Sequence, residues 1–137
     1  MWGRYERGKG MREIKFRGIS KETNEWVFGY YIVAAGMPFI SVFGVREPIL
    51  IIPETLGQYI GKDTTGREIY EGDIIKGFFN NSSTKKSIGR IEYDNCCFVV
   101  TLEFEYGQIC HTRFNIEDCE FLGNIYDNPE LLEEIKE

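Results

Sequence analysis

The segment at residues 97–104 places a large apolar side chain at every second position. These positions are Phe98, Val100, Leu102 and Phe104, and the residues between them include Thr101 and Glu103. Successive side chains of a β-strand point to opposite faces, whereas a helix repeats every ~3.6 residues. The pattern therefore predicts a strand with one face in the core, and it makes a β-sheet the scaffold to expect.

Comparable apolar runs recur along the chain, separated by polar turns at roughly 8 to 12 residues. They begin at Arg12 and then cover residues 25–33, 39–43, 48–52, 56–60, 73–79, 87–93, 108–114 and 120–125. An aromatic share of 15% also suits half-buried pleated surfaces. The spacing predicts a mainly β protein, with an N-terminal β-hairpin subdomain followed by a small barrel or sandwich.

Three parts are expected along the chain. Residues 1–10 have no period and contain three glycines, so we interpret them as a leader or tail and Met11 as the natural start. Residues 11–61 are the predicted N-terminal β-rich subdomain. The polar turn at residues 61–66 marks the boundary, and residues 62–137 are the predicted barrel domain with its C-terminal helix.

The run at residues 25–33 is apolar on both faces. Its two alternating sets are Trp26, Phe28, Tyr30 and Ile32, and Val27, Gly29, Tyr31 and Val33. Strands of this kind are typical of sheets that are covered on both sides. We therefore expect this strand to be central or covered twice.

One short helix is predicted at the C-terminus, from residue 129 to about Lys136. Asn128 can act as the cap, Pro129 suits the first helical position, and Glu130 favours the positive end of the helix dipole. Leu131, Leu132 and Ile135 would form its narrow apolar stripe. Such a helix needs a partner surface, because it is too short to persist alone in water.

The net charge of −6 argues against a nucleic-acid partner. The first ten residues contribute +2, from Arg4, Arg7, Lys9 and Glu6, so the remainder carries −8. Nucleic-acid binding draws on basic side chains that displace counterions from phosphates. The basic element in the body is the polar loop at residues 80–86, with Lys85 and Lys86, and it leaves a small nucleic-acid-binding module open as the alternative.

The sequence predicts a protein of the cytoplasm. No apolar run approaches the roughly 20 residues that span a bilayer, and no secretory signal is present. The four cysteines contain no C-x-x-C pair and fit free structural thiols, so neither a metal nor a cofactor is expected.

Three constellations could carry chemistry, and each has a simpler explanation. Cys110 and His111 are neighbours, but neighbours in a strand point apart. A zinc site could draw on Cys96, Cys97, Cys110, His111 and Cys119, yet their spacing matches no common zinc motif. The eight carboxylates between Glu117 and Glu137 could imitate nucleic-acid phosphates, or they form a solvated face.

Aromatic residues are more numerous than a core of this size can enclose. The candidates for partner contact are Trp26, Tyr30, Tyr31 and Tyr106. Protein interfaces favour tyrosine and tryptophan in their cores. We therefore predict that some of these side chains face a protein partner or a second copy.

Three segments resemble the YopX-like family. They are residues 11–18 (MREIKFRG), residues 58–63 with 66–76 (QYIGKD and GREIYEGDIIK), and residues 122–132 (LGNIYDNPELL). The ten-residue leader and residues 34–52 depart from the resemblance. Its structural motif residues in this chain are Gly61, Gly66, Tyr70, Gly72, Asp73, Gly123, Asn124, Asn128 and Pro129.

The resemblance implies a β-rich protein with an SH3-like barrel in its C-terminal part, encoded in phage or prophage genomes and often oligomeric. It implies no catalytic residues. In physical terms, Gly72 can supply positive φ, and Asp73 can accept a local backbone N–H and fix the turn before an apolar strand. We interpret Asp73 as a turn-forming residue and not as an acid or base.

The sequence thus predicts a non-catalytic phage or prophage accessory protein that binds protein, either itself as a homo-oligomer or a host factor. It contains no phosphate-binding loop, dinucleotide fingerprint, nucleophile elbow or zinc-protease helix. A hydrolase with unrecognised carboxylates is the third alternative, after the nucleic-acid-binding module.

Overall fold

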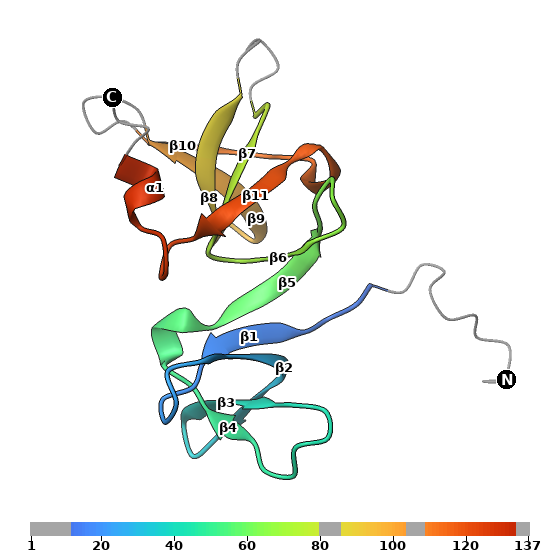
Figure 1. The fold of residues 1–137 in the computed structure, drawn as a ribbon, viewed down its shortest axis with the longest axis vertical. Coiled ribbons are helices and arrows are strands. Elements are labelled where there is room, and N and C mark those ends of the chain that lie inside the picture. The colour runs from blue at the N-terminus through green and yellow to red at the C-terminus, as the bar shows by residue number, and fades with distance from the viewer. Residues whose placement is uncertain (1–11, 80–85, 104–108, 134–137) are drawn as a thin grey trace, which may run out of the picture.

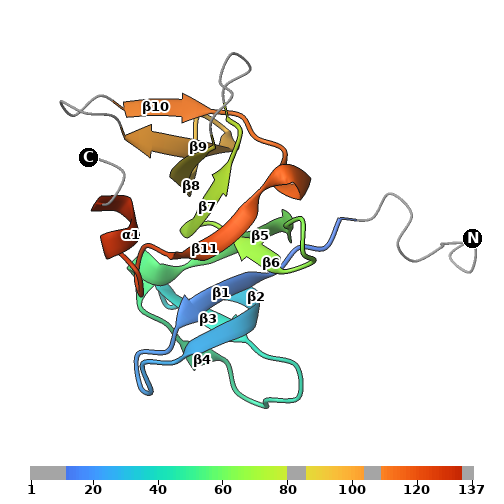
Figure 2. The same ribbon diagram turned by 45° about the horizontal axis from the view of Figure 1, so that its top comes forward.

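The computed structural model describes residues 12–79, 86–103 and 109–133, and it confirms a mainly β protein (Figure 1). Two antiparallel sheets lie one above the other, with the N-terminal sheet at the bottom of the view. Strand β11 (Glu120–Asn124) of the upper sheet lies near β5 (Gly57–Lys62) and β6 (Glu68–Tyr70) of the lower one in the turned view (Figure 2), and the Phe121 N–H on β11 donates to Asp63 between these two strands. The predicted leader lies outside the described residues.

The first sheet has the strand order β4-β3-β2-β1-β5-β6. Its strands are β1 (Phe16–Ile19), β2 (Trp26–Ala34), β3 (Met37–Ser41), β4 (Ile49–Leu50), β5 (Gly57–Lys62) and β6 (Glu68–Tyr70), with a 3₁₀ turn at Pro53–Thr55. The turn at residues 61–66, predicted as the subdomain boundary, therefore joins two strands of this one sheet. The chain leaves the sheet only after Tyr70. The sequence did not predict this boundary, because the three residues of β6 are too few to show a periodic pattern.

The far edge of the first sheet curls back onto β1. Ile51 forms an isolated antiparallel bridge with Ser20. Ile40 and Ile51 are fully buried inside the curl. Gly18 permits this packing, since a Cβ atom at that position would lie 2.5 Å from Ile51 Cδ1. The first sheet thus has a small apolar interior of its own.

The second sheet has the strand order β10-β9-β8-β7-β11. Its strands are β7 (Asp73–Gly77), β8 (Ser87–Asp94), β9 (Cys97–Glu103), β10 (Ile109–Thr112) and β11 (Glu120–Asn124), followed by α1 (Glu130–Glu133). In the part of the chain that the structure describes, β10 and β11 are edges and do not pair with each other. The predicted barrel is therefore an open sheet over these residues.

The main apolar core lies against the second sheet. Its buried members are Ile69, Ile75, Phe79, Ile91, Val100, Leu102 and Cys119. Val100 and Leu102 belong to β9, so the apolar face predicted from the period of two is confirmed there. Ile69 belongs to β6 of the first sheet, so the same core also ties the two sheets together.

A buried ion pair joins the sheets at their centre. Arg17 Nη2 on β1 lies 2.8 Å from Asp73 Oδ1 on β7, and the two side chains are 7% and 1% exposed. The second oxygen of Asp73 accepts the N–H of Tyr70 at 2.7 Å, which is the local bond predicted for a turn-forming aspartate. The Arg17 guanidinium also lies 4.5 Å from the ring centroid of Trp26.

Gly72 carries the chain from the first sheet to the second. Its φ of +93° favours glycine, and a Cβ atom there would lie 3.0 Å from Cε2 of Tyr126. Its N–H donates to the Ile91 carbonyl and its carbonyl accepts from the Ile125 N–H, both at 2.9 Å. The crossing is therefore anchored to strands on either side.

Asp63 is a second link between the sheets. In the turn between β5 and β6, its Oδ1 accepts the N–H groups of Thr65 at 2.8 Å and Arg67 at 3.0 Å, and the Thr65 hydroxyl at 2.7 Å. Its Oδ2 accepts the N–H of Phe121 on β11 at 3.1 Å. Burial acts to raise the pKa of this carboxyl, but the hydrogen bonds outweigh it and lower the pKa.

The loop between β11 and α1 differs in part from the prediction. Asn128 precedes the helix, as predicted, and its backbone carbonyl accepts the N–H of Leu131 at 3.1 Å, but its side chain accepts the N–H of Asn124 at 3.3 Å and so closes the loop. Gly123 leaves room for it, since a Cβ atom there would lie 2.5 Å from Asn128 Oδ1. The helix begins at Glu130, directly after Pro129, and its predicted end near Lys136 lies outside the described residues.

The ion pair yields the first prediction. Replacing Arg17 by Met leaves the Asp73 carboxylate buried without a cation, so the free energy of unfolding should fall by about 3–5 kcal/mol at pH 7. Adding Asp73→Leu removes the stranded charge and should restore much of the loss, although the Tyr70 N–H then lacks its acceptor. Urea unfolding of wild type, Arg17→Met and the double variant measures both effects.

Two further results test the cause. Burial raises the pKa of Asp73 against the opposing charge of Arg17, so losing Arg17 should raise it further. A raised folded-state pKa gives stability as pH falls, so Arg17→Met should become relatively more stable between pH 7 and pH 5. Arg46→Met, at an exposed position, is the matched control. Equal stability of the single and double variants would contradict this account.

Asp63 yields a prediction of opposite sign. Its folded-state pKa is lowered, so its contribution is present above the unfolded pKa of about 3.9 and is lost as pH falls through the folded-state value. Asp63→Asn should cost about 1–3 kcal/mol at pH 7, because an amide NH₂ cannot accept the Phe121 N–H. The cost should shrink below about pH 4. Asp94→Asn, at an exposed position, is the control, and a cost that does not change with pH would contradict the assignment.

Candidate protein-binding surface

Strand β2 is central in its sheet, as predicted from its apolar sequence, but large side chains on both of its faces are exposed. It pairs with β1 on one side and β3 on the other. Tyr30 is 63% exposed and Val33, on the opposite face, is 58% exposed. The reason lies in the stacking, because the second sheet meets the first at β1, β5 and β6 and leaves β2 and β3 beyond its edge (Figure 2).

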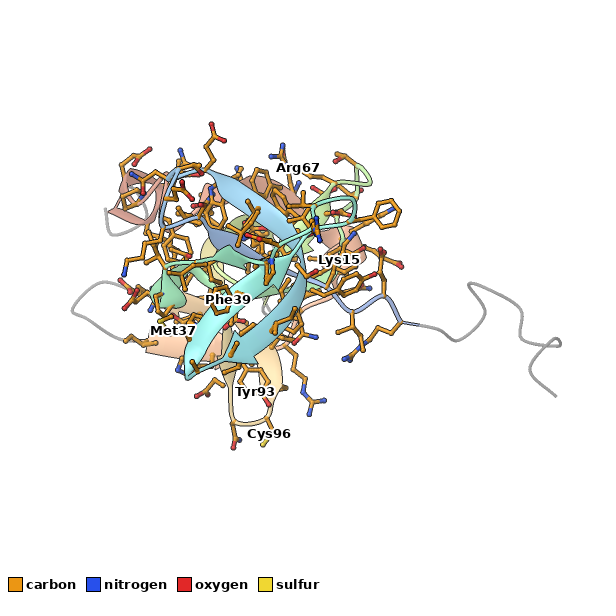
Figure 3. All side chains as sticks on the ribbon, turned by 90° about the horizontal axis from the view of Figure 1, so that it is seen from below. Lys15, Met37, Phe39, Arg67, Tyr93 and Cys96 are labelled. Atoms are coloured by element: carbon orange, nitrogen blue, oxygen red, sulfur yellow. The ribbon has the colours of Figure 1, made fainter. Side chains whose placement is uncertain are left out.

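The strand register gathers apolar side chains on one face of β2, β3 and β4. Ile32 is opposite Phe39, which is itself opposite Leu50. We call this surface the β2–β3 apolar face, and its members are Phe28, Tyr30, Ile32, Met37, Phe39 and Leu50. Phe28, Tyr30, Ile32 and Met37 are exposed, and the other two are half-buried. Figure 3 looks at this end of the molecule from below, with Met37 and Phe39 over the strands nearest the viewer.

The face continues into a hollow beside β4. This hollow has a volume of about 450 Å³. Phe39 and Leu50 line its floor, and Lys21, Glu22 and Glu47 are among the residues at its rim. A concave apolar floor with a charged rim is the form that accepts a side chain from a protein partner.

The four aromatics predicted to meet a partner do not form one group. Tyr30 and Tyr31 are both exposed on β2, on opposite faces of the strand. Trp26 is half-buried at the junction, where its Nε1–H donates to Asp127 Oδ2 at 2.9 Å. Tyr106 lies outside the described residues. Sequence reasoning did not assign Met37 or Phe39 to a binding surface, since their contribution depends on the register between β2 and β3.

A second hollow, the junction hollow, lies where the sheets meet, and its volume is about 330 Å³. Its lining residues are Arg17, Trp26, Phe28, Arg67, Glu68, Tyr70, Asp73, Phe121, Asn124 and Asp127. Phe28 belongs both to this hollow and to the β2–β3 apolar face. The two features are therefore continuous along β2.

The rings of the junction hollow pack edge to face or tilted. Phe28 and Tyr70 have ring centroids 5.6 Å apart, and Trp26 and Tyr126 are 5.7 Å apart. The Tyr126 hydroxyl donates to the Glu54 carbonyl at 2.8 Å, which ties the C-terminal loop to the first sheet. Burial and the nearby Glu68 carboxylate raise the pKa of Tyr70 well above its ordinary value, so its hydroxyl stays protonated.

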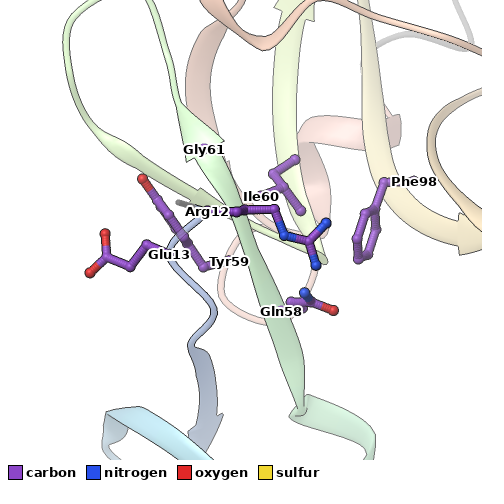
Figure 4. A pocket seen from close by; sticks show the side chains of 7 residues that line it. All are labelled: Arg12, Glu13, Gln58, Tyr59, Ile60, Gly61 and Phe98. Atoms are coloured by element: carbon purple, nitrogen blue, oxygen red, sulfur yellow. The ribbon is translucent and has the colours of Figure 1, made fainter. Parts of the chain in front are cut away.

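A third hollow lies on the other side of β5 (Figure 4). Its volume is about 280 Å³, and it is lined by residues that include Gln58, Ile60 and Phe98. The Arg12 guanidinium points towards the Phe98 ring (Figure 4). Arg12 itself is exposed at the start of the described residues.

The chemical constellations considered from the sequence are spread over the second sheet. Cys110 is opposite Leu102 and His111 is opposite Thr101, so the two neighbours sit on opposite faces. The Thr101 hydroxyl donates to Glu92 at 2.8 Å and lies 2.9 Å from His111 Nδ1. Because the hydroxyl proton is given to Glu92, His111 Nδ1 carries the hydrogen in this arrangement.

Cysteines are not brought together as ligands. Cys96, Cys97 and Cys110 are exposed, whereas Cys119 is buried in the core, which raises the pKa of its thiol to about 11. Within the described ranges no three His, Cys, Asp or Glu side chains come close enough to hold a metal ion. Those same residues include no helix with the length and apolar character needed to cross a membrane.

The structural motif residues converge on the junction instead of on the exposed face. Gly72 and Asp73 form the crossing, Tyr70 lines the junction hollow, and Asn124 holds the loop that follows β11. Gly61 and Gly66 shape the turn that carries Asp63, both with positive φ. The sequence did not single out Arg17 or Asp63, although each lies inside a segment that carries the family resemblance.

Comparison with known proteins agrees with this structural picture. A family model described as YopX protein matches residues 15–133, a range that includes every strand of both sheets and α1. No curated protein matches the chain. Since the match spans well over half of the sequence, the chain belongs to the YopX protein family.

Proposed function

We propose that this protein is a non-catalytic accessory protein of a phage or prophage that acts in the host cytoplasm by binding protein. The partner is a second copy of the chain or a host protein, and the contact is made by the β2–β3 apolar face. The observation that carries the proposal is a central strand, β2, whose large apolar side chains are exposed on both faces.

The physical argument concerns the cost of leaving this face in water. Burying one large apolar side chain completely is worth roughly 1.5–3 kcal/mol. Four side chains of the face remain largely exposed in the isolated chain, so a partner that covered them would gain much of this free energy: Phe28, Tyr30, Ile32 and Met37. Contiguous exposed apolar surface of this kind marks protein interfaces in folded proteins.

Self-association and binding to a host protein both depend on the lack of charged side chains in the β2–β3 apolar face. The side chains that form it carry no charge, so two copies can meet there without placing like charges together. The same lack of charge suits an apolar surface on a host protein. The overall charge of −6 acts at longer range and would slow the approach of two copies at low salt.

Within this proposal, the second sheet and α1 correspond to the SH3-like barrel that the family resemblance implies. Nucleic-acid binding remains the less favoured function. Of its two lysines, Lys85 lies outside the described residues, and Lys86 Nζ is 5.8 Å from the ring centroid of the exposed Phe78. The negative charge of the chain works against that function.

The test is to make the face polar. In Tyr30→Ser with Ile32→Ser, the apolar contact area is lost, so association should weaken by about tenfold or more. Light scattering of the purified chain over a range of concentrations measures self-association. Crosslinking to proteins of the host cell, with the wild type and the variant side by side, measures binding to a host protein.

The matched control is Tyr93→Ser, since Tyr93 is 58% exposed but lies on the second sheet. It should behave as wild type in both measurements. Far-ultraviolet circular dichroism should show that all three chains fold alike. If the double variant and Tyr93→Ser associate as strongly as wild type, the β2–β3 apolar face is not the binding surface.

A further inference from the structure

Arg67 has an unusual place at the mouth of the junction hollow. Its Cζ lies 3.7 Å from the ring centroid of Phe121, and it forms no ion pair with any residue that the structure describes. A guanidinium that stacks on a ring keeps its N–H groups in its own plane, where they point past the ring. This is the geometry that meets a carboxylate with two parallel hydrogen bonds.

Arg17 lines the same hollow but offers it no free donor. Its side chain is more than nine-tenths buried, and its charge is paired with Asp73. Its Nε is itself buried, so a ligand in the hollow does not reach that N–H. Arg67 is therefore the group that can meet an anion there.

The carboxylates that line the junction hollow are already engaged. Asp73 is held by Arg17, and Glu68 forms an ion pair with Lys15. The Oδ2 atom of Asp127 accepts hydrogen bonds from Trp26 Nε1 and Asn124 Nδ2. None of them comes within ion-pair distance of Arg67. The hollow therefore contains one guanidinium without an ion-pair partner among the described residues, that of Arg67, and aromatic rings line the space beside it.

We propose that the junction hollow binds a carboxylate side chain of the protein partner, held by the Arg67 guanidinium. This inference rests on the proposed function and names the chemistry of the partner. Phe28 lines the hollow and also belongs to the β2–β3 apolar face. A partner segment can thus place an acidic residue in the hollow and apolar residues over Tyr30 and Ile32.

The site can be tested without a partner by using benzoate, a flat carboxylate, and benzamide, its uncharged counterpart. The indole N–H of Trp26 lines the hollow and reports on it in a proton–nitrogen NMR spectrum. Benzoate should shift the Trp26 signal in a saturable way, and benzamide should shift it much less. Equal shifts, or no shift with benzoate, would overturn the proposal.

Variants of Arg67 identify the group that binds. Arg67→Gln removes the charge and should weaken benzoate binding by about tenfold or more, because hydrogen bonds between charged groups are lost. Arg67→Lys keeps the charge but not the paired donors, so its affinity for benzoate should lie between those of the wild type and Arg67→Gln. Arg46→Gln, at an exposed position that does not line the hollow, is the matched control and should bind as wild type. Unchanged binding in Arg67→Gln would overturn the proposal.

A charge-reversal variant, Arg67→Glu, and the double variant of Tyr30 and Ile32 separate this inference from the proposed function. If the double variant of Tyr30 and Ile32 loses association but Arg67→Glu keeps it, the binding face stands and the carboxylate site is refuted. If Arg67→Glu lowers association by about tenfold while benzoate binds the wild type, the site is supported as part of the interface. If benzoate binds but neither substitution changes association, the hollow takes small carboxylates and the protein-derived carboxylate is refuted.

Discussion

The buried ion pair between Arg17 and Asp73 is the contact on which the two-sheet arrangement depends. A charge in the interior is tolerated only with a well-placed counter-charge, so each sheet supplies what the other needs. The pair also fixes the Trp26 and Tyr70 rings around the guanidinium. Because Asp73 also forms the turn after Tyr70, one carboxylate sets both the local crossing and the position of the sheets.

This attachment determines which surface stays exposed. The second sheet is held against β1, β5 and β6 by Arg17, Asp63 and the loop that contains Tyr126. Strands β2 and β3 extend past that contact, and Tyr30, Ile32, Val33 and Met37 on them are exposed. The exposed face is thus a consequence of where the sheets are joined. Its strand β2 pairs with β1, which the ion pair of Arg17 attaches to the second sheet.

The sequence predicted what local periodicity can report. The apolar face of β9 was correct because Val100 and Leu102 repeat every two residues, and the turn bond of Asp73 was correct because it is local. The central position of β2 was predicted correctly, but the exposure of its faces was not, since an apolar strand of a core and one of an interface have the same pattern. Asn128 was correctly placed before the helix, but its side chain meets the N–H of Asn124 across a loop. The register between strands and the contacts between residues far apart in the chain cannot be predicted from the periodicity of one segment.

The placement of the family motifs separates scaffold from binding surface. The segments with the resemblance supply Arg17, Asp63, Asp73 and Asn124, which hold the junction together. The β2–β3 apolar face is built from residues between the first two segments, including the 34–52 region that departs from the resemblance. The proposed partner surface therefore rests on residues that the motifs do not contain. The exception is the junction hollow, which is lined both by Arg67 from a motif segment and by Phe28 from the β2–β3 apolar face.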